Sequence, residues 1–208
     1  MLHFETVEPD TLRLLNRLMT SETLKEFCLV GGTGLSLRYG HRKSIDLDLF
    51  STVQFESTEI LDNLRKEGIL FRETFSSNKL GIFGFIDGIK VDLVRHHYHQ
   101  LIDEIKIEDG IRIFGDKDII AMKISAILRR AVKKDFWDVS ELLDHYTMEE
   151  FITFYETKYP AEQLLISIPR SLTYFDDAEN SPNPECLRGL TWEDVKNKIR
   201  SAVSDYLS

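Results

Sequence analysis

Two aspartates stand two positions apart in a segment that alternates between apolar and acidic side chains. Asp46 and Asp48 lie within residues 44–50, SIDLDLF. This alternation predicts a strand on which both carboxylates project from one face. Like charges held so close repel each other, and Mg²⁺ or Mn²⁺ would remove that cost because carboxylate oxygens suit these ions. Aspartates on a solvated strand face are the alternative, so the pair by itself is a weak signal for a metal site.

A glycine turn precedes this segment. The apolar residues 27–30 end in Gly31-Gly32-Thr33. Two glycines let the backbone approach a bulky anion, and the helix that follows directs unpaired N–H groups at it. Thr33 adds a hydroxyl and is predicted to cap that helix. We therefore predict a phosphate-gripping turn, although an ordinary strand-to-helix turn would look the same.

Known glycine-rich nucleotide motifs do not describe this turn. The stretch GGTGLSLRYG lacks the third glycine of the Rossmann fingerprint and the Gly-Lys-Ser/Thr ending of the P-loop. The phosphate site would have to be of another kind.

A third carboxylate comes from Asp92, the only acidic residue in the apolar segment 89–94, IKVDLV. Burying an unpaired carboxylate is costly, which favours a functional partner. If this strand lies beside residues 44–50, three carboxylates converge. Together with triphosphate oxygens they could hold two metal ions about 3.5–4 Å apart for in-line displacement at phosphorus. Asp92 would then serve as a metal ligand, a general base or both.

Basic residues recur in the helical pattern of residues 116–146. Lys123, Arg130 and Lys134 fall at i, i+7 and i+11, close to one stripe if the helix continues unbroken. Such a stripe could reach triphosphate oxygens that metal ions leave unneutralised. A solvated charged face is the alternative, but Lys123 stands alone among apolar residues, which favours a functional role.

The elements that must position these side chains follow from periodicity and turn signals. The first half mixes strands and helices, and the second half is helical. We therefore predict an α+β fold with a core over residues 1–115 and a helical domain over residues 116–208 that closes a nucleotide cleft. The predicted strands are 27–30, 44–50, 69–75, 80–86 and 89–94. The predicted helices are 11–27, with an interruption near Thr20-Ser21, and 33–39, 57–68, 116–146, 148–159, 161–171 and 191–207.

Composition narrows the choice of function. The chain has 208 residues and a formal net charge of −9, so it is not a general binder of polyanions. Any nucleotide contact must come from local basic patches or bound metal. The sequence shows no apolar stretch of membrane-spanning length and no signal-peptide pattern, which predicts a cytoplasmic protein without a membrane partner.

Two segments carry a family resemblance. GGTGLSLRYGHRKSIDLDLF resembles the motif of DNA polymerase beta-type nucleotidyltransferases: glycine, a small residue, a short helix, then Asp-x-Asp. YGHRKSIDLDLF resembles more particularly the AbiEii/AbiGii-type abortive-infection toxin family. DIIAMKISAILRRAVKKDFWDVSELL resembles that family's lysine-bearing helix and its Lys-Asp-aromatic-x-Asp segment. The resemblance covers roughly residues 29–143, and it implies a mixed sheet with flanking helices followed by a C-terminal helical domain.

The resemblance also implies roles for individual residues. Gly32 and Thr33 match the phosphate turn, where the family's common serine is replaced by threonine. Asp46 and Asp48 match the metal ligands. The full set of candidate site residues is Gly31, Gly32, Thr33, Asp46, Asp48, Asp92, Lys123, Arg130 and Asp135; of these, Lys123 matches the nucleotide-contacting lysine and Asp135 the acidic residue of the later motif.

The implied activity is the metal-dependent transfer of a nucleoside monophosphate from an NTP to an acceptor hydroxyl, with release of pyrophosphate. The acceptor could be RNA, such as a tRNA 3′ end. The protein would be the toxin of a toxin–antitoxin or phage-defence pair, with a cognate antitoxin. Two alternatives remain at this point: nucleotidylation of a protein side chain, and a non-catalytic nucleotide-binding regulatory module of the same fold.

Overall fold

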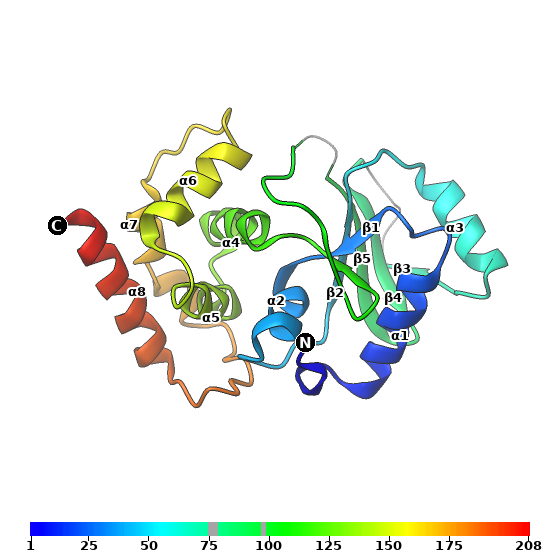
Figure 1. Ribbon diagram of the computed structural model, residues 1–208, viewed down its shortest axis with the longest axis horizontal. Helices are drawn as coiled ribbons and strands as arrows, with labels where there is room; N and C mark the ends of the chain where they lie inside the picture. The colour runs from blue at the N-terminus through cyan, green and yellow to red at the C-terminus, as the bar shows by residue number, and fades with distance from the viewer. Residues whose placement is uncertain (75–78, 97–98) are drawn as a thin grey trace.

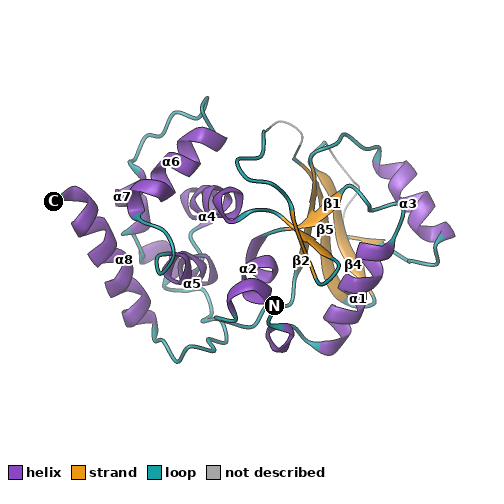
Figure 2. Ribbon diagram, viewed as in Figure 1, coloured by secondary structure: helices purple, strands orange, loops and turns teal. Residues whose placement is uncertain are grey.

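The structure, a computed structural model, describes residues 1–74, 79–96 and 99–208. At its centre is a mixed sheet, to which the described residues contribute seven strands in the order β3-β4-β5-β2-β1-β7-β6. Figure 2 shows this sheet with helices on both sides. The predicted α+β architecture is confirmed. The strands are β1 (Phe27–Leu29), β2 (Leu47–Ser51), β3 (Arg72–Glu73), β4 (Gly81–Ile86), β5 (Ile89–Arg95), β6 (Lys106–Glu108) and β7 (Ile111–Ile113).

The helices of the described residues form two groups, one before and one after the last strand. The first group is α1 (Pro9–Thr20), α2 (Gly31–Tyr39) and α3 (Ser57–Lys66). The second is α4 (Asp116–Arg130), α5 (Lys133–Leu142), α6 (Met148–Lys158), α7 (Ile168–Leu172) and α8 (Trp192–Leu207). Helices α1 and α3 lie on one side of the sheet, while α2 lies between the sheet and the later helices (Figure 1). None of these helices combines the length and apolarity that crossing a lipid bilayer requires.

The middle of the sheet fulfils the condition on which the carboxylate cluster depended. Strand β2 runs antiparallel to β1 and parallel to β5, so the Asp-x-Asp segment does lie beside the strand that carries Asp92. The two-residue turn Asp87-Gly88 joins β4 to β5, with positive φ at both residues, as expected of such a hairpin. Residue 75, the end of one predicted strand, lies outside the described residues, and β3 is limited to Arg72–Glu73.

Two predicted helix boundaries are wrong in ways that matter for the site. Helix α2 begins at Gly31 with Val30 as its N-cap, so Thr33 is inside the helix and does not cap it. The long helix over 116–146 is two helices, because Ala131 adopts a left-handed conformation with φ of 37°. As a result, Lys123 and Lys134 belong to different helices and do not share one stripe.

Two further corrections concern the edges of the fold. The predicted helix over 161–171 shrinks to α7, since its first half is irregular. The β6–β7 hairpin was not predicted, although Asp109-Gly110 at its turn repeats the signal seen at Asp87-Gly88. Its strands of three residues each are too short to show a periodic pattern. Strand β7 pairs with β1 in parallel, and α4 follows directly from it.

Candidate active site

The carboxylates of Asp48 and Asp92 lie side by side on the sheet. Asp48 on β2 and Asp92 on β5 are directly opposite each other in the parallel ladder, so both side chains leave the same face. Asp46 precedes β2 and is not in the strand, which corrects the prediction that one strand carries the whole pair. Its Oδ2 lies 3.2 Å from Lys134 Nζ on α5. Strand pairing therefore fixes Asp48 beside Asp92, whereas Asp46 lies just before the strand and pairs with a helix residue.

The glycine turn comes close to this pair. Gly31 has φ of +67°, and a Cβ placed on it would lie 2.9 Å from Asp48 Oδ2. A Cβ on Gly32 would collide with the Arg42 guanidinium. Glycine is therefore required at position 31 by the Asp48 carboxylate and at position 32 by the Arg42 guanidinium. The first N–H groups of α2, which lack intrahelical acceptors, thus begin beside the Asp48 carboxylate.

Thr33 takes a different position from the one expected. Its side chain is buried, and its Oγ1 donates a hydrogen bond to the Asp46 carbonyl and shares another, 2.8 Å long, with Ser44 Oγ. The hydroxyl holds the backbone of Asp46 in place. In this arrangement Thr33 positions a carboxylate and does not present its hydroxyl to a phosphate.

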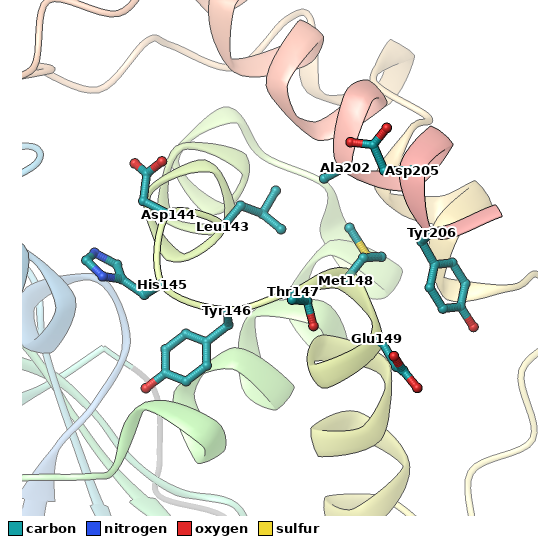
Figure 3. A pocket seen from close by; sticks show the side chains of 10 residues that line it. All are labelled: Leu143, Asp144, His145, Tyr146, Thr147, Met148, Glu149, Ala202, Asp205 and Tyr206. Atoms are coloured by element: carbon teal, nitrogen blue, oxygen red, sulfur yellow. The ribbon is translucent and has the colours of Figure 1, made fainter. Parts of the chain in front are cut away.

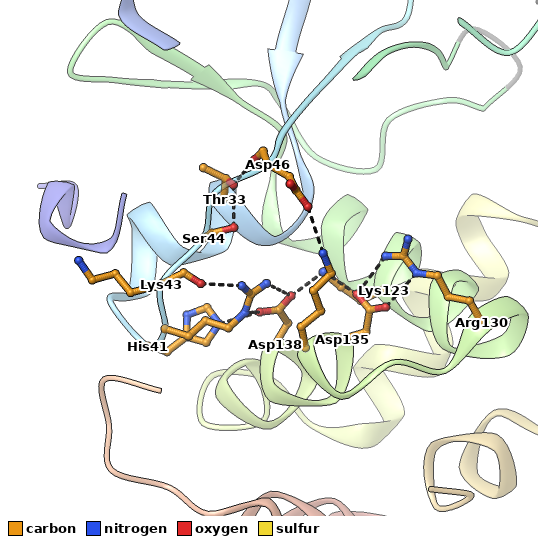
Figure 4. A network of polar contacts seen from close by, with 11 residues as sticks. Thr33, His41, Lys43, Ser44, Asp46, Lys123, Arg130, Asp135 and Asp138 are labelled. Carbon is orange, nitrogen blue, oxygen red and sulfur yellow. Dashed lines mark hydrogen bonds and ion pairs between the residues drawn. The ribbon is translucent and has the colours of Figure 1, made fainter. Parts of the chain in front are cut away.

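One buried carboxylate connects the sheet side of the site to the helices. Asp138 on α5 is fully buried and accepts hydrogen bonds from Arg42 Nε at 2.7 Å and Nη2 at 2.9 Å. It also accepts one from His41 Nε2 at 2.7 Å, and its Oδ2 lies 2.5 Å from Lys123 Nζ. Dashed lines in Figure 4 trace this network. Burial would raise the pKa of Asp138, but Arg42 and Lys123 outweigh it and hold that pKa well below the usual value.

Lys123 lies inside this network. Its Nζ is 2.9 Å from Asp135 Oδ1 as well as close to Asp138, and only 7% of its side chain is exposed. Burial opposes its protonation, but the two aspartates outweigh that effect and raise the Lys123 pKa. Arg130 Nε approaches Asp135 Oδ2 at 3.2 Å, with 57% of the arginine side chain exposed. The predicted Lys123, Arg130 and Asp135 are thus brought together.

The donor set at Asp48 and Asp92 is compatible with a divalent cation. Among the described residues, Asp92 Oδ1 is buried with no hydrogen-bond partner, while Oδ2 pairs with Lys90 Nζ at 2.8 Å. Burial raises the pKa of Asp48, and Asp92 adds to that shift against the opposing charge of Lys90. No three His, Cys, Asp or Glu residues in the described ranges are placed to share one ion. Nucleotide oxygens would have to supply the remaining ligands.

Comparison with known proteins agrees with this geometry. The sequence pattern of the AbiEii nucleotidyl transferase toxins of type IV toxin–antitoxin systems matches residues 13–82, which include the glycine turn, Asp46 and Asp48. An uncharacterized protein of Aquifex aeolicus is 34% identical over 198 residues, covering 93% of this chain and 94% of its own length. The chain belongs to the AbiEii nucleotidyltransferase toxin family. It is a nucleotidyltransferase, and the family implies an NTP substrate and a cognate antitoxin.

Solved structures show the same fold as this AbiEii-family chain. A candidate nucleotidyltransferase of H. pylori superposes with a TM-score of 0.59 at 16% identity, over 97% of this chain and 99% of that chain. MenT4, a nucleotidyltransferase toxin of Mycobacterium tuberculosis, superposes with a TM-score of 0.57 at 14% identity, over 92% and 83%. The predicted polymerase beta-like fold is thereby confirmed.

Three residues of this AbiEii-family site were not predicted to act together. His41 and Arg42 stand in the GHRKS segment and are not among the candidate site residues predicted from the sequence. Asp138 is the second aspartate of KDFWD, a segment whose first aspartate, Asp135, was the one assigned. The repeated acidic residue at i, i+3 on a helix was a usable signal, because such residues share a face. The basic partners of Asp138 lie far away in the sequence, so residue spacing could not identify them.

A large cavity of the molecule lies away from these carboxylates. It measures about 770 Å³ and opens between the α5–α6 connection and the C-terminal part of α8. Figure 3 shows Tyr146, Met148 and Tyr206 at its wall. None of the candidate site residues lines it.

The contact between Gly31 and Asp48 makes a specific prediction. We expect Gly31→Ala to reduce nucleotidyl transfer about 100-fold, because a Cβ would displace the Asp48 carboxylate and small misplacements of catalytic groups cost that much. The matched control is Gly88→Ala, which has φ of +83° but no atom within 4 Å of its Cβ. Both variants should lose about 1–2 kcal/mol of unfolding free energy from the left-handed backbone. Transfer assays and urea unfolding measure the two effects, and equal activity in both variants would refute this role of Gly31.

Proposed function

We propose that the chain transfers a nucleoside monophosphate from an NTP to an acceptor hydroxyl in a metal-dependent reaction that releases pyrophosphate. The observation that carries this proposal is the register of Asp48 against Asp92, with the glycine turn of α2 beside Asp48. A carboxylate pair next to a phosphate-binding helix end is the arrangement that nucleotidyl transfer requires.

Asp46, Asp48 and Asp92 would hold the metal ions. The orphaned, buried Oδ1 of Asp92 supports this assignment, because a buried carboxylate oxygen without a partner is costly. When bound, Mg²⁺ or Mn²⁺ activates the attacking hydroxyl and neutralises charge on the phosphates. Asp46 would exchange its ion pair with Lys134 for such a ligand role. Asp92 would accept the proton of the acceptor hydroxyl.

The phosphates would be bound by the start of α2 and by basic side chains of the helices. Gly31 and Gly32 offer backbone N–H groups, and the side chains of Arg130 and Lys134 are 57% and 44% exposed. These two can reach solvent, whereas Lys123 lies behind them and orients Asp135 and Asp138. We include in the proposal a core over residues 1–115 and a helical domain over residues 116–208, with the nucleotide bound between them.

RNA is the proposed acceptor, with a tRNA 3′ end as one example. The AbiEii-family relationship and the toxin MenT4 among the proteins of this fold support a toxin role. A phage-defence setting and a cytoplasmic location, where NTPs and RNA are available, belong to the same proposal.

The test supplies purified protein with each α-³²P-labelled NTP, Mg²⁺, and either total RNA or total cell protein. We expect label on RNA, with one NTP preferred and with no transfer when EDTA replaces Mg²⁺. Asp46→Ala/Asp48→Ala should abolish labelling, and Asp144→Asn, in an exposed ion pair with Lys198, should retain it. Absence of transfer by the wild type, or equal transfer by the double variant, would overturn the proposal. Label on protein alone would replace the RNA acceptor with a protein one.

A further inference from the structure

Lys90 stands two positions before Asp92 on β5, on the sheet face that carries the carboxylates. Residues two apart in a strand project from one face. Lys90 Nζ donates a hydrogen bond to Asp92 Oδ2 at 2.8 Å, and the lysine side chain is 46% exposed. Of the positive charges that act on Asp48, that of Lys90 has the largest effect. One ammonium group therefore offsets part of the charge of both carboxylates.

Lys90 also lies at the end of the strands where the glycine turn begins. Val30, the residue before the turn, donates its backbone N–H to the Asp48 carbonyl at 2.9 Å, so the chain enters the turn level with the Asp48–Asp92 pair. Asp46 and Lys90 directly precede the first residue pair in the ladder between β2 and β5. Both residues therefore lie toward the end of the sheet from which α2 starts, and Asp46 also attracts Lys90.

The contacts of Lys90 differ from those of the buried lysine of the site. Lys123 is 7% exposed and contacts two carboxylates, those of Asp135 and Asp138. Within the described part of the chain, the ion pair of Lys90 is with Asp92 alone. A half-exposed pair of one lysine with one carboxylate contributes little to stability, because water competes for both charges. Lys90 can therefore leave Asp92 at a small cost in free energy, whereas Lys123 cannot leave its partners so easily.

The Lys90 ammonium and a divalent cation compete for Asp92, because two positive charges held so close repel each other. If a free ion displaced the ammonium, Lys90 would lose its carboxylate and gain no other partner. A metal–triphosphate complex brings phosphate oxygens to the same end of the strands, where the displaced ammonium can donate hydrogen bonds to them. Lys90 therefore opposes the binding of free metal ions and favours the binding of metal–nucleotide complexes.

We propose that Lys90 is an exchangeable counter-ion, which pairs with Asp92 in the metal-free protein and moves to the triphosphate when a metal–nucleotide complex binds. The protein then takes up its metal together with the nucleotide and binds free Mg²⁺ or Mn²⁺ weakly. This inference rests on the proposed function, since it names how the same carboxylates distinguish free metal from nucleotide-bound metal. Lys90 is thus a specificity-determining residue of the site.

Binding of free metal tests the first half of this exchange. The probe is Mn²⁺ alone, whose unbound fraction is measured from its electron paramagnetic resonance signal at pH 7 and fixed salt. We expect Lys90→Met to bind Mn²⁺ about fivefold more tightly than the wild type, which corresponds to about 1 kcal/mol, the upper end for an exposed ion pair. Lys90→Arg keeps the charge and should bind Mn²⁺ no more tightly than the wild type. Affinity of Lys90→Met equal to or below that of the wild type would overturn the proposal.

Two comparisons keep this effect apart from a general change of charge or of fold. Lys66→Met on α3 removes the same charge from an exposed lysine and should change the affinity for Mn²⁺ less than twofold. In EDTA, Lys90→Met should have a lower thermal midpoint than the wild type, because Asp48 and Asp92 then repel each other without a counter-ion. Mn²⁺ should raise that midpoint more than it raises the wild-type one. Equal gains in Mn²⁺ affinity in the two variants, or a lower midpoint that Mn²⁺ does not restore, would refute the counter-ion role.

Nucleotide binding tests the second half of the exchange. The probes are the α,β-methylene analogues of the four NTPs, which resist transfer, titrated by calorimetry at saturating Mn²⁺. We expect Lys90→Met to bind the preferred analogue about fivefold more weakly than the wild type, because no ammonium moves to its phosphates. The affinities for free Mn²⁺ and for the metal–nucleotide complex should therefore change in opposite directions, while Lys90→Arg and Lys66→Met keep wild-type values for both. Unchanged or tighter binding of the analogue by Lys90→Met would contradict the exchange.

These measurements separate failure of the inference from failure of the proposed function. If the wild type labels RNA with Mg²⁺ but Lys90→Met changes neither affinity, the counter-ion role is refuted and the proposed function stands. If the two affinities change in opposite directions but no acceptor is labelled, the exchange stands and nucleotidyl transfer is refuted. If the wild type binds neither Mn²⁺ nor any analogue, both are refuted.

Discussion

Asp48→Asn is expected to lower the kcat/KM of nucleotidyl transfer by about 1,000-fold or more without destabilising the metal-free protein. Asparagine keeps the shape of the side chain but removes the charge that would hold a metal ion. Metal ions contribute several kcal/mol to stabilising such a transition state, and each 1.36 kcal/mol corresponds to a factor of ten in rate. The loss should be seen with saturating NTP and with either Mg²⁺ or Mn²⁺.

The unfolding free energy of Asp48→Asn should not fall with its activity and should stay equal or rise. Burial and the neighbouring Asp92 raise the pKa of Asp48, which means that the charged form is disfavoured in the fold at neutral pH. The Asp48→Asn substitution removes one of two adjacent like charges. Urea unfolding in EDTA at pH 7 is therefore expected to give a free energy equal to or higher than that of the wild type.

Added Mg²⁺ and NTP distinguish the two proteins further. Ligands that bind only the folded state stabilise it in proportion to the logarithm of their concentration above Kd, so the wild type should gain stability where Asp48→Asn does not. Asp144→Asn serves as the control, with wild-type behaviour in both assays. If Asp48→Asn unfolds at a lower urea concentration than the wild type in EDTA, the lost activity is explained by misfolding. That result would contradict the proposed role of Asp48.

Asp138→Leu is expected to cost about 3–5 kcal/mol of unfolding free energy, because removing one member of a buried ion pair leaves the other charge uncompensated. Here buried Arg42 would lose its carboxylate partner, and buried Lys123 would keep only Asp135. The exposed pair of Asp144 with Lys198 gives the contrast, since Asp144→Asn should cost less than about 1 kcal/mol. Urea unfolding at pH 7 measures both. A loss at Asp138 as small as that at Asp144 would mean that the network contributes little to stability.

A double variant tests whether the cost comes from the orphaned charge. Asp138→Leu combined with Arg42→Met removes both members of the strongest pair. We expect it to be more stable than the sum of the single effects, because uncharged neighbours need no counter-charge. Additive losses would show instead that each side chain acts through packing alone.

The pH dependence of the Asp138 effect has a defined sign. The pKa of Asp138 is held well below its ordinary value of 3.8 because Arg42 and Lys123 outweigh burial. The pKa of Asp135 is also lowered, by Lys123 and Arg130. A lowered folded-state pKa stabilises the fold above the unfolded-state value, and that contribution is lost as the pH falls through the folded-state values. The gap in stability between wild type and Asp138→Asn should therefore be constant from pH 7 to about pH 5 and narrow below pH 4. A gap that widens on acidification would contradict the assigned charges.

Local sequence determined the parts of the site that depend on backbone conformation and on the alternation of apolar and polar residues along a strand. The Gly31-Gly32 turn, the Asp-x-Asp segment and the hairpin at Asp87-Gly88 were all predictable, because glycine freedom and the period of two act within a few residues. The α+β order of elements followed from the same local patterns. Asp92 was identified as well, since a single carboxylate in an apolar strand requires a partner wherever that strand lies.

Tertiary structure alone decided which side chains meet. The left-handed conformation of Ala131 breaks the long helix, and no local interaction favours that conformation. The break places Asp135 next to Lys123 and Arg130. Asp138 receives Arg42 from almost a hundred residues earlier, and the strand order brings Asp92 beside Asp48. Such contacts follow from how the elements pack around one core, and local periodicity carries no information about them. The carboxylates of this site could therefore be predicted from the sequence, whereas the cations around them could be assigned only from the fold.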